Sequence, residues 1–133
     1  MTRAELIEAL ETAQGADSIY STCGMICDAW DMRIESDPAF KRFAIENAEK
    51  FSRFLTANAY LDAAMMLVPD MCLHMVRTVW ADANKPNEQT AGYASVDRYY
   101  RDDSGLWWKE NFLSTAATPA LALAAACLRA GGE

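Results

Sequence analysis

The sequence TPALALAAACLRA, residues 118–130, decides the fold of this chain. Thr118 and Pro119 predict a helix start, because threonine can accept a backbone N–H at the N-cap and proline fits the first turn. Gly131 and Gly132 follow directly and are typical of a helix end. The residues between these signals are apolar almost all round. They predict a C-terminal helix over 118–130 that is well buried.

Upstream of this helix, three segments predict the strands of an antiparallel meander. They are MCLHMVRTVW (71–80), YASVDRYY (93–100) and LWWKENF (106–112), rich in β-branched and aromatic residues. A turn-rich segment at 82–92 and the short polar segment RDDSG separate them. In the middle strand, alternation puts Tyr93, Ser95, Asp97 and Tyr99 on one face.

The first half of the chain predicts helices. Thr2 and Glu5 fit a capping box, and apolar residues then recur at helical spacing as far as Gly15. A second helix is predicted over 18–30. Asp37 as cap and Pro38 in the first turn predict a third helix, which extends to Phe54.

A short helix follows, with Asn58 as its N-cap, continuing through Leu67 and ending before Pro69. The predicted fold is therefore one α+β domain, a layered sandwich in which an antiparallel sheet of three or more strands packs against helices. Residues 2–67 are helical, 71–112 strand-rich and 118–130 the C-terminal helix. The length of 133 residues, 52% of them hydrophobic, fits a single globular domain rather than a disordered chain.

The net charge is −7, from 12 basic and 19 acidic residues. Binding to a phosphate backbone depends on Lys and Arg, so direct nucleic-acid or anionic-membrane binding is not expected. The N-terminus lacks the apolar region of a signal peptide, and no apolar run approaches the ~18 residues of a membrane span. We therefore expect a cytoplasmic protein, with its cysteines as free buried thiols.

No motif predicts a cofactor, a metal or a catalytic site. Cys23 and Cys27 lie one helical turn apart, and Cys72 and His74 share a strand face, so a zinc site is conceivable if they converge. The cysteines lie among Ile, Met and Leu, which favours a core role instead. His74 with a cysteine could act as base and nucleophile, but no orienting group or oxyanion hole is indicated. The chain is expected not to be an enzyme.

Aromatic and acidic residues cluster in the last two predicted strands. Trp107 and Trp108 are adjacent and must face opposite sides of a strand. The cluster either fills the layers of the sandwich or anchors a protein interface, where Tyr and Trp are common. The candidate partner-binding residues are Tyr99, Tyr100, Asp102, Asp103, Trp107, Trp108 and Glu110.

Three segments in order, MTRAELIEALETAQGAD, LDAAMMLVPD and TPALALAAACLRA, resemble the family of small phage and prophage proteins classed with the phage ABA (alpha-beta-alpha) sandwich domain. Their shared frame is an N-terminal helix, a helix before the strands and a terminal helix. Residues 18–55 depart from the family pattern. In this region the relatives look like aromatic, glycine-rich strands, whereas these residues predict helices. The resemblance implies a layered fold and a phage or prophage origin, and it implies no activity.

These observations favour a phage-encoded acidic protein that binds a host or phage protein. One hypothesis is an anti-CRISPR-like inhibitor of a host defence system. Such an acidic protein would bind the basic nucleic-acid groove of a nucleic-acid-handling complex by imitating the charge of phosphates. A structural or self-assembling phage protein is the alternative, and a homodimer is compatible with either. A small enzyme that uses His74 ranks last.

Overall fold

The computed structural model describes residues 2–13, 22–69, 72–80 and 90–131. Its elements, in chain order, are α1 (Arg3–Thr12), α2 (Thr22–Ser36), α3 (Pro38–Thr56), α4 (Tyr60–Met65), β1 (Cys72–Trp80), β2 (Thr90–Arg101), β3 (Trp107–Ala116) and α5 (Pro119–Ala130). The strands form one antiparallel sheet in the order β1–β2–β3. The predicted α+β class and antiparallel meander are confirmed.

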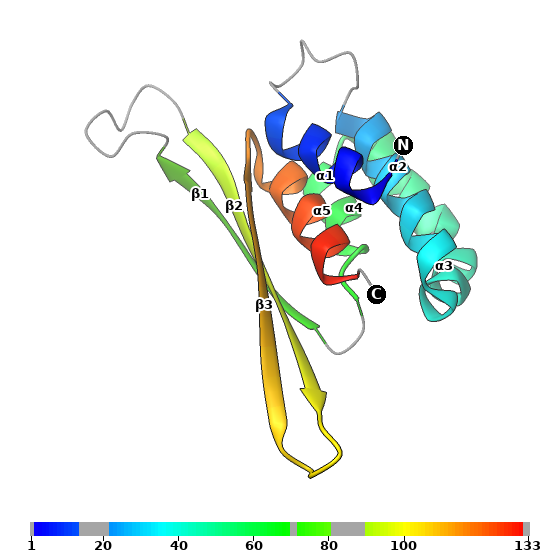
Figure 1. Ribbon diagram of the computed structural model, residues 1–133. Helices are drawn as coiled ribbons and strands as arrows, with labels where there is room; N and C mark the ends of the chain where they lie inside the picture. The colour runs from blue at the N-terminus through cyan, green and yellow to red at the C-terminus, as the bar shows by residue number, and fades with distance from the viewer. Residues whose placement is uncertain (1, 14–21, 70–71, 81–89, 132–133) are drawn as a thin grey trace.

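The described helices all lie on one side of the sheet, so these elements form two layers (Figure 1). Helix α5 packs directly on β2 and β3, and α1, α2 and α4 pack around α5. Helix α3 lies farther out, against α2 and α4. We call the uncovered side of the sheet the outer face. It is formed by the odd-numbered residues within 73–77, 93–101 and 107–115, because neighbouring residues of a strand face opposite sides.

Helix α5 is the centre of the molecule, as its sequence predicts. Every residue from Ala120 to Leu128 is buried, and Arg129 is the exposed exception in its last turn. The Thr118 hydroxyl accepts the Leu121 N–H at 3.3 Å, with Pro119 in the first turn. Small alanines let α5 lie close to the other elements around it, since they add little width to the helix.

The capping box of α1 is also confirmed: Thr2 Oγ1 accepts the Glu5 N–H at 3.2 Å, and the Glu5 carboxylate accepts the Thr2 N–H. Leu6, Ile7 and Leu10 bury the inner side of this short helix. The capping box and the helical spacing of the apolar residues therefore predicted the start of α1 and its buried side correctly.

Several predicted boundaries are wrong. Helix α2 continues to Ser36 instead of ending at Trp30, because Arg33 is buried and pairs with Asp37 rather than ending an apolar face. Strand β3 continues past Phe112 to Ala116, and β2 begins at Thr90 inside the predicted loop. Gly92, Ser114 and Ala116 near these ends are small and buried, and such residues carry too weak a strand signal to be recognised.

The predicted role of Asn58 is also wrong. Asn58 adopts a positive φ of 58° and ends α3, while Ala59 precedes α4 without a side-chain cap. The Asn58 N–H donates to the Leu55 carbonyl at 3.1 Å, and the Ala59 N–H donates to the Phe54 carbonyl at 2.8 Å. Asparagine tolerates the left-handed region that closes a helix, so the same residue type suits either end. The predicted end of the first helix at Gly15 is wrong too, because α1 ends at Thr12 with Ala13 as its C-cap. Gly15 itself, residues 18–21, Met71 and residues 82–89 lie outside the described residues.

Candidate partner-binding hairpin

The β2–β3 hairpin extends well beyond the helical layer (Figure 1). Strand β2 and helix α5 each have 12 residues. At about 3.3 Å per residue a strand of this length spans ~40 Å, whereas a helix at 1.5 Å per residue spans ~18 Å. The strands are therefore longer than the helix that covers them, and none of the described helices covers the inner side of the hairpin at its far end.

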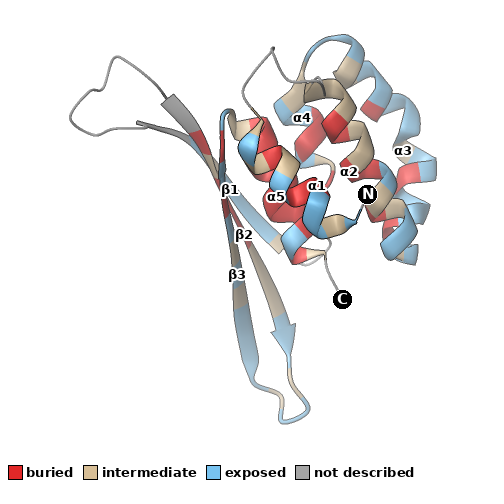
Figure 2. Cartoon of the chain, turned by 45° about the horizontal axis from the view of Figure 1, so that its top comes forward, coloured by how far each residue is buried: buried red, intermediate tan, exposed pale blue. Residues whose placement is uncertain are grey.

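Most residues at this far end are exposed (Figure 2). They include large apolar residues on both faces of the hairpin. Trp107, on the outer face, is 61% exposed and Trp108, on the inner face, is 51% exposed. Tyr100 and Leu106 beside them are 42% and 60% exposed. These aromatic side chains do not fill the layers of the sandwich, so one of the two interpretations left open by the sequence is wrong for them.

Asp102 organises the turn that joins the two strands. Its Oδ1 accepts the N–H groups of Ser104 at 2.9 Å and Leu106 at 3.0 Å, and also the Ser104 hydroxyl. Its Oδ2 accepts the indole N–H of Trp108. Gly105 supplies the positive φ of 89° that the turn requires. The tip of the hairpin is thus held by one carboxylate rather than left as a loose loop.

These hydrogen bonds, those from Ser104 and Trp108 first, lower the pKa of Asp102 from 3.8 to about 2. Because the pKa of Asp102 is lowered, the hydrogen bonds of its carboxylate stabilise the turn fully above the ordinary pKa of 3.8. This stabilisation is lost as the pH falls through the lowered pKa. We expect the Trp108 indole N–H resonance to titrate with a midpoint near pH 2, measured by NMR, and the Trp107 indole to serve as reference. Asp102→Asn should abolish this titration, and a midpoint near 4 would contradict the bonded turn.

The structure places the remaining candidate partner-binding residues in different environments. Tyr99 is half-buried on the outer face, and Asp103 is exposed in the turn. Glu110 lies on the inner face and is paired with Arg98 at 3.1 Å. Arg98 also donates to the Ala130 carbonyl at 3.0 Å, which joins the hairpin to the end of α5. Glu110 is therefore a structural residue of the hairpin, and the other six share its exposed end.

Sequence reasoning missed a second set of exposed residues, which lies on the outer face nearer the body of the molecule. Leu73, Met75 and Leu113 are 63%, 50% and 49% exposed. Met75 and Leu113 flank the small Ser95 in strand register. Apolar residues in alternate positions of a strand are typical of a buried face. These three residues can therefore be recognised as exposed only once it is known which face of the sheet the helices cover.

The cysteines and His74 do not form a site in the described residues. No group of three or more potential metal ligands comes together there. Burial raises the pKa of the Cys127 thiol, and burial together with Cys23 raises the pKa of Cys27 to about 11. A raised pKa disfavours the thiolate, the reactive form, so the electrostatics of these thiols oppose nucleophilic chemistry.

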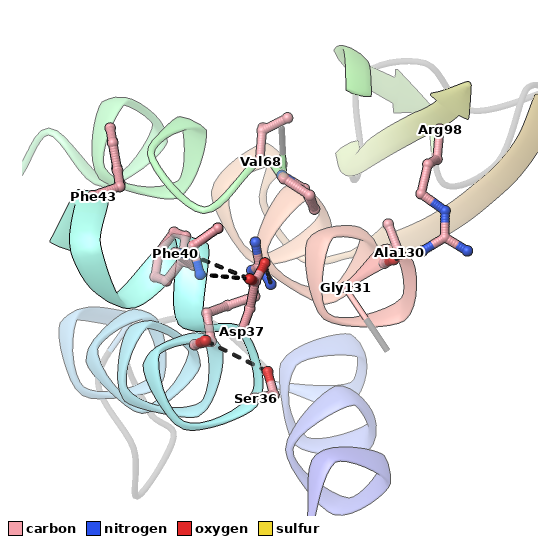
Figure 3. A pocket seen from close by; sticks show the side chains of 11 residues that line it. Ser36, Asp37, Phe40, Phe43, Val68, Arg98, Ala130 and Gly131 are labelled. Atoms are coloured by element: carbon pink, nitrogen blue, oxygen red, sulfur yellow. Dashed lines mark hydrogen bonds and ion pairs between the residues drawn. The ribbon is translucent and has the colours of Figure 1, made fainter. Parts of the chain in front are cut away.

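A cavity of about 350 Å³ lies between the α2–α3 junction, the segment after α4 and the end of α5 (Figure 3). Arg33 and Arg98 both reach its wall. The Arg33 guanidinium pairs with Asp37 at 3.3 Å, donates to the Leu67 carbonyl at 3.3 Å and lies 4.4 Å from the Phe40 ring centroid. With Arg98 engaged by Glu110, both cations already have partners, and the cavity offers no unpaired charge to a ligand.

No protein-family model, curated protein sequence or solved structure matches this chain. None of the described helices combines the length and the apolar character needed to cross a membrane. Fold and surface together define a class: a two-layer α+β protein with an uncovered sheet face and a projecting aromatic hairpin.

Proposed function

We propose that this chain acts by binding another protein, and that the exposed end of the β2–β3 hairpin is the surface it uses. One observation carries the proposal: the hairpin leaves the helical layer with Trp107 and Trp108 exposed on opposite faces. An exposed tryptophan keeps apolar area in contact with water, and tryptophan is among the commonest residues that dominate binding energy at protein interfaces.

The hydrogen-bonded turn supports the same proposal, because it holds Trp108 in a fixed position. Asp102 holds the indole of Trp108 and three other donors, so the anchor side chain is positioned before a partner arrives. A preordered anchor loses less conformational entropy on binding than a flexible one. Asp103 adds an exposed acidic group beside it, and the chain carries a net charge of −7. A partner with an apolar pocket and a basic rim complements this end of the hairpin.

The phage origin and the inhibition of a host defence system stay predictions that rest on the sequence resemblance and the acidity. A basic nucleic-acid-handling complex is the kind of partner that this charge favours. A structural or self-assembling role remains the second candidate, favoured by the exposed apolar residues of the outer face.

The test is affinity capture from a lysate of the encoding cells with tagged wild-type protein and the variants Trp108→Ala and Leu106→Ser. We expect a partner to be enriched by the wild type and lost, at least tenfold, with both variants, since removing a central anchor commonly costs more than 1.4 kcal/mol. Ile45→Ala is the matched control, because Ile45 is 71% exposed on α3, away from the sheet. A captured set that is unchanged by the hairpin variants would refute the assignment of this surface, and an oligomer that resists dilution would favour self-assembly.

A further inference from the structure

The outer face of the sheet pairs aromatic rings with cations. In strand register, Tyr93 lies opposite Arg77, Tyr99 opposite Lys109 and Trp107 opposite Arg101. The Arg77 guanidinium carbon lies 4.6 Å from the centroid of the Tyr93 ring. Each of the three aromatic side chains of this face therefore has a positive charge as its direct cross-strand neighbour.

The acidic residues near these rings in the sequence mostly do not share the face. Glu110 is on the inner face and paired with Arg98. Asp102 and the exposed Asp103 lie in the turn, where Asp102 is bonded to Trp108. Only Asp97 lies on the outer face, where it accepts the Asn111 amide. The strands thus carry three cations and one carboxylate on this face of an otherwise acidic chain. The net charge of −7, on which the expectation against direct nucleic-acid binding rests, belongs to the whole chain and not to this face.

The other acidic residues of the chain affect a ligand on the outer face only if they lie close enough to it. Electrostatic screening is strong beyond ~10 Å at 0.1 M salt. The helical layer lies about one layer spacing, ~10 Å, behind the sheet, on its opposite side. At moderate salt a charged ligand on the outer face therefore interacts mainly with the three cations, with Asp97 and, at the Trp107 end, with the turn carboxylates Asp102 and Asp103.

From this arrangement we propose that the outer face binds single-stranded nucleic acid. Unpaired bases stack on aromatic rings without regard to sequence, while neighbouring cations neutralise the phosphates. Tyr99 and Trp107 are diagonal neighbours across β2 and β3, a spacing of roughly 7 Å that suits two adjacent stacked bases. Tyr93 lies six residues before Tyr99, ~20 Å along the strand, so the ligand spans several nucleotides.

The residues between the two ends of this platform fit the same ligand. Leu73, Met75 and Leu113 offer apolar contact to bases and sugars, and Ser95 leaves a low point between Met75 and Leu113. A duplex does not bind in this mode, because its bases are stacked within the helix. This site goes beyond the proposed protein binding, which is tested through Leu106 and Trp108 on the turn and the inner face.

The experiment is a titration of a fluorescein-labelled thymidine oligonucleotide of about 12 nucleotides, within the site sizes of single-strand binders, followed by fluorescence anisotropy. Trp107→Ala should weaken binding about tenfold, as expected for loss of one stacked base. Trp108→Ala is the matched control: it is the adjacent tryptophan on the opposite face, and its effect should stay within about twofold.

Charge is tested in the same way. Lys109→Glu should weaken binding strongly, whereas Lys50→Glu, the same change of net charge on α3, should leave binding nearly unchanged. The logarithm of the binding constant should fall with the logarithm of salt concentration with a slope near −2, since each cation contributes about −0.7 on a single strand.

The proposal is overturned if anisotropy does not change up to about 200 µM protein at low salt, beyond the range of weak non-specific binding. Equal losses with Trp107→Ala and Trp108→Ala would also overturn it. Competition by polyglutamate as effective as that by unlabelled oligonucleotide would show that the face recognises acidic protein rather than bases. Loss of nucleic-acid binding with retained partner capture, or the reverse, separates this site from the proposed function.

Discussion

Replacing Gly92 with alanine is expected to destabilise the protein more than the same change at Gly105 or Gly131. A Cβ at this position would lie 2.1 Å from the Thr118 carbonyl carbon and 2.2 Å from the Pro119 nitrogen. Both atoms belong to the backbone at the start of α5, so no side-chain rotation relieves the overlap. The helix must move away from β2, yet α5 is packed on nearly every side.

We expect the free energy of unfolding to fall by more than about 3 kcal/mol, above the usual range for overpacking, because the clash is with backbone. The measurement is urea denaturation followed by circular dichroism. Gly105→Ala is the control: its φ of 89° costs an alanine about 1–2 kcal/mol, and its nearest new contact is the Arg101 side chain at 3.2 Å, which can move. A Gly92→Ala protein within 1 kcal/mol of wild type would show that α5 does not lie this close to β2.

Arg33→Ala is expected to have the second largest effect, a loss of about 3 kcal/mol. Arg33 is 2% exposed and joins the end of α2 to the Leu67 carbonyl after α4 and to Asp37 at the start of α3. Its removal leaves the Leu67 carbonyl without this donor, at a cost of about 1–3 kcal/mol, and opens a cavity under Phe40. Asp37 is 34% exposed, so its charge can be hydrated and adds less.

A matched pair in the same chain isolates the effect of burial. Arg53 and Glu49 are also four residues apart on a helix, but their side chains are 76% and 80% exposed. Arg53→Ala should change the free energy of unfolding by less than about 0.5 kcal/mol, the usual contribution of such surface pairs. Similar losses for Arg33→Ala and Arg53→Ala would mean that Arg33 does not join these elements in solution.

Local signals in the sequence determined the elements around which the protein is built. Helix α5 could be predicted because its caps and its unbroken apolar run act within a few residues of each other. The capping box of α1 and the turn at 102–105 are local in the same sense. Arg33 could not be recognised, because a buried arginine has the same sequence signal as an exposed one until its distant partner, Leu67, is known.

The candidate site was partly predictable for the same reason. Alternation along a strand placed Trp107 and Trp108 on opposite faces, and the aromatic cluster marked the hairpin. Whether those faces were covered depended on where α5 ends relative to β2 and β3. Sequence distance does not give that position, because α5 starts next to the C-terminal end of β3, opposite the turn, and runs back across the sheet.

The sequence by itself determined the helices, the strands, their antiparallel order and the clustering of aromatic and acidic residues. Only the tertiary structure decided which side of the sheet is covered, and therefore which residues meet water. Alternation assigns side chains to two faces but does not say which face is buried, since that depends on packing between elements far apart in the chain. With α5 packed on the inner face, Glu110 is paired with Arg98 there, and Arg77, Arg101 and Lys109 lie beside the aromatic rings of the outer face.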